Sequence, residues 1–170
     1  DPIVLAAQVI MAIQTISSRK VNPLEPVVVT IGSIHGGVKA NVIPEFITLD
    51  GTIRTLHDDL RQRMPELIKD TIRSIIESSG ASFKLDYKWG YSPTVNNPQM
   101  VKLLAETVNK ELGPACGKYL TNPFMIAEDF SFFTQQVPSV YFMLGIKKEN
   151  NNQFPLHHAA FNIEESVMKS

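Results

Sequence analysis

The sequence predicts a mixed α/β chain built from two parts. The first part, residues 1–92, has the element order helix, strand, strand, helix, strand. A β-branched run at Val27–Ile34 and an alternating run at Val42–Thr55 predict the two consecutive strands, and apolar residues spaced three and four apart over His57–Ser79 predict a helix. The stretch Gly90–Pro98 is dense in turn-forming residues and predicts a linker to the second part.

The first helix is predicted from the first residues of the chain. Asp1 is a good N-cap, Pro2 suits the first helical position, and the following run Ile3–Ile13 is largely apolar. Because such a helix needs cover, we expect polypeptide upstream of it, as in a fragment or a processed chain. No basic segment precedes the run, so it is not typical of a secretory signal peptide.

The second predicted strand has an apolar face and a polar face. The apolar face is formed by Ile47, Leu49, Gly51 and Ile53, and the polar face by Thr48, Asp50, Thr52 and Arg54. The guanidinium of Arg54 has the fork geometry that binds a carboxylate with two parallel hydrogen bonds. An exposed charge on a sheet face is the simpler interpretation of the same residue.

The long helix and the strand after it complete the first part. Pro65 predicts either a kink in the helix or its true start, and Gly80 predicts its end. Residues Phe83–Trp89 then alternate between apolar and polar, which predicts a half-buried strand. The order is that of a split β-α-β-β-α-β unit without its first strand, which is central in the ferredoxin-like arrangement.

The second part, residues 93–170, has a different pattern. A helix is predicted from Pro98 to Leu112, and a short helix after Ala127. The continuous apolar run Val140–Gly145 predicts a strand buried on both faces of a parallel sheet. Residues 164–170 are interpreted as the start of another helix.

The composition excludes some classes of function. Hydrophobic residues make up 44% of the chain, charged residues 19%, and the net charge is -1, which gives no sign of a nucleic-acid partner. The apolar runs are shorter than a membrane span, so no membrane partner is expected either. The single cysteine, Cys116, excludes an internal disulfide and fits a cytoplasmic location.

Two short phrases in the second part contain candidate chemistry. His157 and His158 are adjacent, and a neutral imidazole binds Zn²⁺ well, but two solvated loop histidines are the simpler interpretation. Glu128 and Asp129 precede Phe130, and apolar neighbours raise carboxyl pKa values or leave the carboxylates to orient a ligand. Acidic residues at the start of a helix are an equally good explanation.

The chain resembles a known family in phrases that span both parts. These are Gly36–Pro44 followed by Gly51–Thr55, and Ala127–Phe133 followed by Leu156–Phe161. Together they resemble the C-terminal half of metal-dependent amidohydrolases of the aminoacylase family, with its hippurate and auxin-conjugate hydrolases and its more distant zinc carboxypeptidases. The resemblance implies that residues 1–92 are most of a ferredoxin-like lid (dimerisation) domain. It implies that residues 93–170 are the C-terminal part of an α/β metallopeptidase catalytic domain.

The resemblance assigns roles to six residues. His157 matches the last metal ligand of the family, and His158 follows it at a position that orients the ligands. Glu128 and Asp129 match a phrase that borders the active site. Arg54 matches an arginine that contacts the substrate carboxylate, and Asn41 matches a lid asparagine that reaches the active site of the partner subunit. The chain departs from the family at Ala159, where proline is usual, and at Ile126, where glycine is common.

The activity implied is hydrolysis of the amide bond of an N-acyl amino acid or a related conjugate, with a pair of zinc or manganese ions. The implied enzyme is a homodimer joined through the lid, with Val27–Ile34 and His57–Ser79 as contact elements. Because the chain offers one matching ligand, the general base and the other ligands are expected upstream, and no residue here is assigned as catalytic. A non-catalytic dimerisation or ligand-binding module is the alternative.

Overall fold

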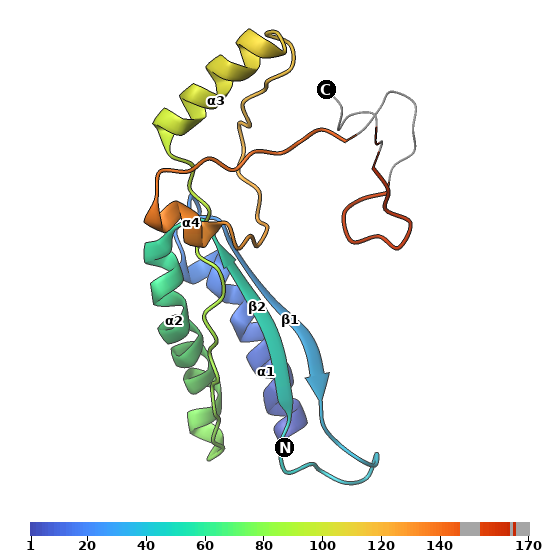
Figure 1. Ribbon diagram of the computed structural model, residues 1–170. Helices are drawn as coiled ribbons and strands as arrows, with labels where there is room; N and C mark the ends of the chain where they lie inside the picture. Colours follow the sequence, from blue (N-terminus) through green and yellow to red (C-terminus); the bar gives the residue numbers. More distant parts are fainter. Residues whose placement is uncertain (147–153, 164, 166–170) are drawn as a thin grey trace.

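The computed structural model describes residues 1–146, 154–163 and 165 (Figure 1). The elements in chain order are α1 (Pro2–Thr15), the π-helical turn η1 (Ile16–Lys20), β1 (Val27–His35), β2 (Thr48–Thr55), α2 (Asp58–Ile76), the 3₁₀ turn η2 (Glu77–Ser79), α3 (Pro98–Glu111) and α4 (Ser131–Gln136). The mixed α/β class is therefore confirmed, as is the order of the first two helices and two strands. The predicted helix over 164–170 lies outside the described residues, apart from residue 165.

Helix α1 begins as the sequence predicts, because the Asp1 carboxylate accepts a hydrogen bond from the Ile3 N–H at 2.9 Å. With η1 it forms a helical stretch, Pro2–Lys20, that is long and apolar enough to cross a membrane by length and composition alone. The expectation that no apolar run reaches that length is therefore wrong for this stretch. Its inner residues Val9 and Ile13 pack into the core, as those of a core helix do.

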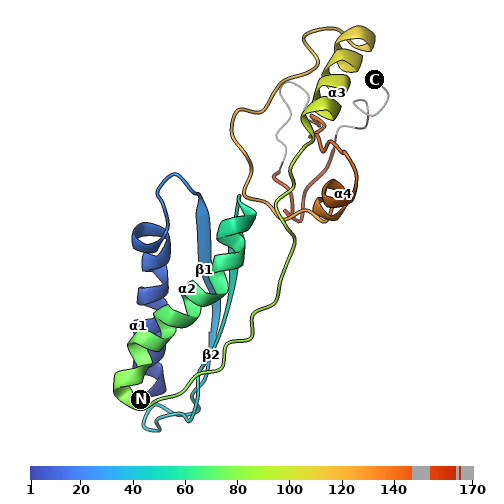
Figure 2. The same ribbon diagram turned by 90° about the vertical axis from the view of Figure 1, so that its left-hand side faces the viewer.

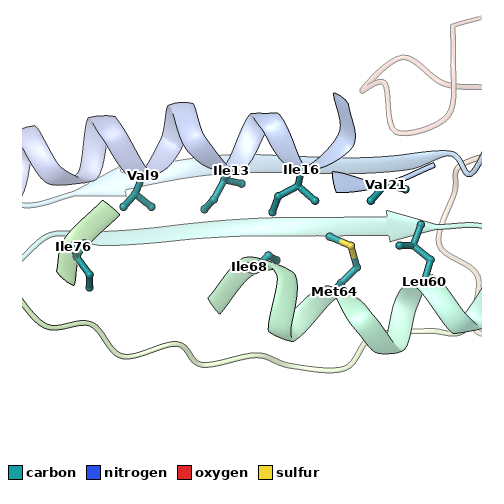
Figure 3. Close-up of a cluster of buried hydrophobic side chains, with 8 residues drawn as sticks. All are labelled: Val9, Ile13, Ile16, Val21, Leu60, Met64, Ile68 and Ile76. Atoms are coloured by element: carbon teal, nitrogen blue, oxygen red, sulfur yellow. The ribbon is translucent and has the colours of Figure 1, made fainter. Parts of the chain in front are cut away.

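The two strands form an antiparallel hairpin, and α1 and α2 cover the same face of it (Figure 2). Helix α1 contacts β1, and α2 contacts β2. The core lies between the helices and the sheet (Figure 3) and consists of Val9, Ile13, Ile16, Val21, Leu60, Met64, Ile68 and Ile76. The apolar face predicted for the second strand is confirmed, because Leu49 and Ile53 pack against this cluster.

Two element boundaries differ from the prediction. Strand β2 begins at Thr48 and not at Val42, because the preceding residues form a loop that turns at Gly37, which has a φ of 80°, and contains Pro44, which lacks an N–H. Helix α2 starts at Asp58 and continues through Pro65, so a helix start at Pro65 is wrong. The predicted end is confirmed, because Gly80 adopts the left-handed conformation with a φ of 69°.

The predicted strand at Phe83–Trp89 is an extended segment and not a strand. Its alternation is real, since Leu85 and Tyr87 are half-buried and pack against the core cluster. A strand also needs a neighbour to bond its N–H and C=O groups, and in the described part of the chain the sheet consists of β1 and β2 alone.

The predicted buried strand at Val140–Gly145 is also wrong. This segment is not part of a sheet, and Phe142, Met143 and Leu144 are exposed. Burial on both faces requires parallel neighbours and covering helices, which the described residues do not supply.

A tight contact inside the hairpin gives a first prediction. A Cβ added at Gly51 would lie 2.5 Å from the Thr30 carbonyl oxygen and 3.0 Å from Ile31 Cδ1, so Gly51→Ala must push the strands apart. We expect a loss of about 1–3 kcal/mol in the free energy of unfolding, measured by urea denaturation. Gly32→Ala is the matched control, because its nearest neighbour would be the Asp50 carbonyl oxygen at 4.0 Å. Equal losses in the two variants would contradict the steric explanation.

Candidate functional site

The face of the hairpin that the helices leave open is polar. Residues directly opposite each other share a face, and the register pairs Arg54 with Val28 and Thr52 with Thr30. The polar face predicted for the second strand is thus confirmed, and Arg54 is exposed on it.

An irregularity in β1 adds two residues to this face. The register shifts between Ile31 and Ser33, so that Ser33 lies opposite Asp50 and His35 lies opposite Thr48. The Ser33 hydroxyl donates a hydrogen bond to the Asp50 carboxylate at 3.0 Å. His35 is the last residue of β1 and lies on the polar face. Only the pairing register reveals this, because simple alternation along β1 would assign His35 to the core face.

The predicted substrate residues Arg54 and Asn41 lie at opposite ends of the hairpin. Arg54 is the next-to-last residue of β2, while Asn41 is exposed in the loop of residues 36–47 that joins the strands. Figure 1 and Figure 2 show that the end of the hairpin opposite this loop is the one nearer α4. The structure therefore does not bring these two residues together within one chain. Exposed apolar side chains flank Asn41 in the loop, namely Val38, Val42, Ile43 and Phe46.

Glu128 is held by specific hydrogen bonds just before α4. The Tyr141 hydroxyl donates to one of its carboxylate oxygens at 2.9 Å, and the Phe130 N–H donates to the other at 3.4 Å. The bond from Tyr141, followed by a bond involving Asp129, lowers the pKa of Glu128, and the same contact with Glu128 raises the pKa of Tyr141. The prediction that the neighbouring phenylalanines raise the pKa of Glu128 is therefore wrong. The hydrogen bonds to the charged carboxylate lower this pKa more than burial raises it.

The two residues that bond this carboxylate, Tyr141 and Phe130, belong to a group of contacting aromatic rings. The centroid of the Phe130 ring lies 5.5 Å from that of Tyr141 and 5.6 Å from that of Phe133. The Phe132 ring meets the Tyr91 ring edge-on, with centroids 5.7 Å apart. The last contact links the end of the first part of the chain to α4. Asp129 is exposed, and its backbone carbonyl accepts the Phe132 N–H at 3.0 Å in the first turn of α4.

The histidine pair lies in a compact turn. His157 has a φ of 70°, the only positive value among the described residues other than glycine, and its side chain is exposed. His158 Nδ1 accepts the Ala160 N–H at 3.1 Å, and its ring stacks on Phe154 with centroids 4.2 Å apart. Because Nδ1 is an acceptor, the neutral His158 ring carries its proton on Nε2. Among the described hydrogen bonds none engages the His157 side chain, so its imidazole is the freer of the two to bind a metal.

The donors in the described residues do not complete a metal site. Among residues 1–146, 154–163 and 165 there is no group of three or more His, Cys, Asp or Glu side chains placed to hold a metal ion. Figure 1 also shows the segment 154–163, which contains the histidine pair, lying apart from α4. The described residues alone therefore do not form a site that fits a metal pair.

Comparison with known proteins decides the family. The model of peptidase family M20/M25/M40 matches residues 5–170, nearly the whole chain. The chain belongs to peptidase family M20/M25/M40. This confirms the resemblance to the amidohydrolases and zinc carboxypeptidases that the sequence phrases indicate.

Several M20 relatives are similar over 99% of this chain. An N-acetyldiaminopimelate deacetylase of Streptococcus thermophilus is 37% identical over 173 residues, and thermostable carboxypeptidase 2 of Saccharolobus solfataricus is 34% identical over 171 residues. The crystal structure of the Bacillus subtilis YXEP protein, described as a dinuclear metal-binding peptidase of the M20 family, superposes with a TM-score of 0.75 at 26% identity. The chain spans less than half of each, namely 43%, 42% and 42% of their respective lengths.

Proposed function

We propose that this chain is the C-terminal part of a metal-dependent amidohydrolase that cleaves the amide bond of N-acyl amino acids or related conjugates. The observation that carries the proposal is the M20 match over residues 5–170, together with relatives named as a deacetylase and a carboxypeptidase. Both names describe hydrolysis of an amide bond next to an amino-acid carboxylate. The exposed Arg54 on an uncovered polar face is chemically suited to that carboxylate.

The roles of the two parts follow the same proposal. Residues 1–92 are the lid, and this is supported by the core cluster and the residues packed on it, all of which lie between Val9 and Tyr87. Residues 93–170 belong to the catalytic domain and contribute His157 to a divalent metal pair, zinc or manganese. The Bacillus subtilis relative, described as dinuclear, supports a pair. The other ligands and the general base would lie in the remainder of a longer protein. We also propose a cytoplasmic location, in line with the single cysteine.

The test is hydrolysis by the longer protein that carries this chain. We expect release of free amino acid from N-acetyl amino acids, loss of that activity with a chelator, and recovery when Zn²⁺ or Mn²⁺ is added. The alternative, a non-catalytic binding module, has different consequences. Binding of N-acyl amino acids without release of product, with metal present, would refute hydrolysis and favour that module.

The 170-residue chain by itself is expected to be inactive. One imidazole, His157, cannot hold a catalytic metal pair, and the described residues contain no group of three or more donor side chains placed to bind a metal. The measurement is amidase activity of the purified chain with added Zn²⁺ or Mn²⁺, beside the longer protein as a positive control. Metal-dependent turnover by the chain alone would show that the donor set is complete after all.

The longer protein is expected to be a homodimer joined through the lid. Strand β1 contains no Asp, Glu, Lys or Arg, and in the described structure one of its edges is unpaired, so it can pair with a second copy across a two-fold axis. Of the two helices, α1 suits this contact better than the α2 expected from sequence. Helix α1 exposes Val4 and Met11, whereas the outer face of α2 carries ion pairs such as Arg73 with Asp70.

The oligomeric state of the longer protein is measured by light scattering at micromolar concentration. A dimer is expected for the wild type and a shift toward monomer for Met11→Glu, because a buried charge without a partner opposes association. Arg63→Glu on the charged face of α2 is the matched control and should leave the dimer intact. A wild-type monomer would contradict the proposal, and an equal effect of both substitutions would reject α1 as the contact helix.

A further inference from the structure

Asn96 makes an unusual pair of hydrogen bonds with residue 141, 45 positions further along the chain. Its side-chain oxygen accepts the Tyr141 N–H at 2.7 Å, and its side-chain NH₂ donates to the Tyr141 carbonyl oxygen at 2.8 Å. A primary amide offers the same donor and acceptor as a peptide group, so Asn96 bonds this residue as a neighbouring strand would. The adjacent Asn97 N–H donates to the Ser139 carbonyl oxygen at 2.9 Å, which extends the pairing by one residue.

These hydrogen bonds fix the position of Tyr141, which in turn bonds Glu128, one of the candidate site residues. The backbone of Tyr141 is clamped by Asn96, and its hydroxyl reaches the Glu128 carboxylate at 2.9 Å. The Tyr141 ring packs against the Phe130 ring, with the two ring centroids 5.5 Å apart. Asn96, Tyr141 and Glu128 are all partly buried, so these bonds are better shielded from water than those at the surface.

We infer that Asn96 is a positioning residue for Glu128, acting through Tyr141. The linker over Gly90–Pro98 is then not a free hinge. It is bonded to the segment 139–141 by Asn96 and Asn97, and Tyr91 meets Phe132 of α4. A displacement of the linker would therefore move Tyr141 and, with it, the direction of the Glu128 carboxylate. The inference rests on the proposed function only in treating Glu128 as part of the site.

Nuclear magnetic resonance of the 170-residue chain tests this without any assay of activity. One readout is hydrogen exchange of the Tyr141 amide, and the other is titration of the Glu128 side-chain carboxyl carbon. The titratable groups that act on this carboxyl are Tyr141 and Asp129. Asn96→Ala should make the Tyr141 amide exchange about tenfold faster, because it loses its acceptor. The same variant should raise the pKa of Glu128 toward the ordinary glutamate value, because the Tyr141 hydroxyl is displaced.

Three further variants make the result decisive. Tyr141→Phe should raise the pKa of Glu128 at least as far as Asn96→Ala does. Ser139→Ala is the matched control, because the Ser139 hydroxyl donates to the Val137 carbonyl oxygen and does not touch the clamp, and both readouts should stay at wild-type values. Asn96→Asp keeps an acceptor for the Tyr141 N–H but lacks the NH₂ donor, so it should retain protection of that amide while still raising the pKa of Glu128.

An Asn96→Ala chain that is folded by circular dichroism and titrates at Glu128 like the wild type would overturn the inference. If Asn96→Ala does not fold, Asn96→Asp decides by the same criterion. The proposed function fails separately, through absence of hydrolysis by the wild-type longer protein, and that result leaves these readouts unchanged. In an active longer protein, Asn96→Ala should lower kcat with a smaller change in KM, whereas a purely structural role would lower only the thermal stability.

Discussion

His157→Ala in the longer protein is expected to lose one metal ligand and most of the turnover. The imidazole of His157 is exposed, and none of the described hydrogen bonds engages it, so it is the better ligand of the adjacent pair. Its left-handed backbone, with a φ of 70°, is uncommon outside glycine, and such outliers cluster at functional sites. We expect a loss in metal affinity above the roughly 10–100-fold that follows removal of a residue that only orients a ligand.

Two variants separate ligation from backbone effects. His157→Asn removes the imidazole but keeps a side chain that tolerates the left-handed conformation, so it should lose metal as His157→Ala does. His158→Ala should cost only about 10–100-fold, because this ring supports the turn through Phe154 and the Ala160 N–H. Bound metal per subunit, measured by elemental analysis, is the readout. Wild-type metal content in His157→Asn would refute the assignment of His157 as a ligand.

Arg54→Lys is expected to harm substrates that carry a free carboxylate far more than neutral ones. A guanidinium offers two parallel N–H donors that match a carboxylate, and lysine offers a point charge without that fork. If substrate binding removes water from this face, loss of the contact costs about 2–5 kcal/mol. In the structure Arg54 is accessible to a ligand, because it lies on the face of β2 that the helices leave open.

Catalytic efficiency of the longer protein on an N-acetyl amino acid and on its neutral amide measures this selectivity. Wild type and Arg54→Lys are compared on both substrates, and the ratio of the two efficiencies should fall in the variant. Arg63→Lys, on the exposed face of α2, is the matched control and should leave the ratio unchanged. An equal loss on both substrates would mean that Arg54 stabilises the lid sheet and does not bind the substrate.

The elements that sequence predicts correctly are those with a local cause. Asp1 and Pro2 start α1 through the cap and a preset backbone angle, and Gly80 ends the second long helix through its left-handed conformation. The apolar stripe of α2 and the alternation of β2 also arise from the period of the element itself. The face on which Arg54 lies was predictable for that reason.

The predictions that failed depend on partners elsewhere in space. Phe83–Trp89 and Val140–Gly145 have the composition of strands, but a strand forms only where a neighbour bonds its backbone. A bulge between Ile31 and Ser33, invisible in the sequence, changes the face of the residues after it and places His35 on the polar face. In the same way, the phenylalanines beside Glu128 indicated a raised pKa, while the distant Tyr141 lowers it.

The sequence by itself determined the two long helices of the first part, the presence of the two strands between them and the M20 family, because these depend on local periodicity and on short phrases of fixed residues. The tertiary structure decided which groups meet. It placed the Tyr141 hydroxyl on Glu128 and the Asn96 amide on the backbone of Tyr141, across 13 and 45 residues of chain. Such contacts depend on how the chain returns on itself, and a hydrogen bond acts over about 3 Å, so no local pattern can specify them.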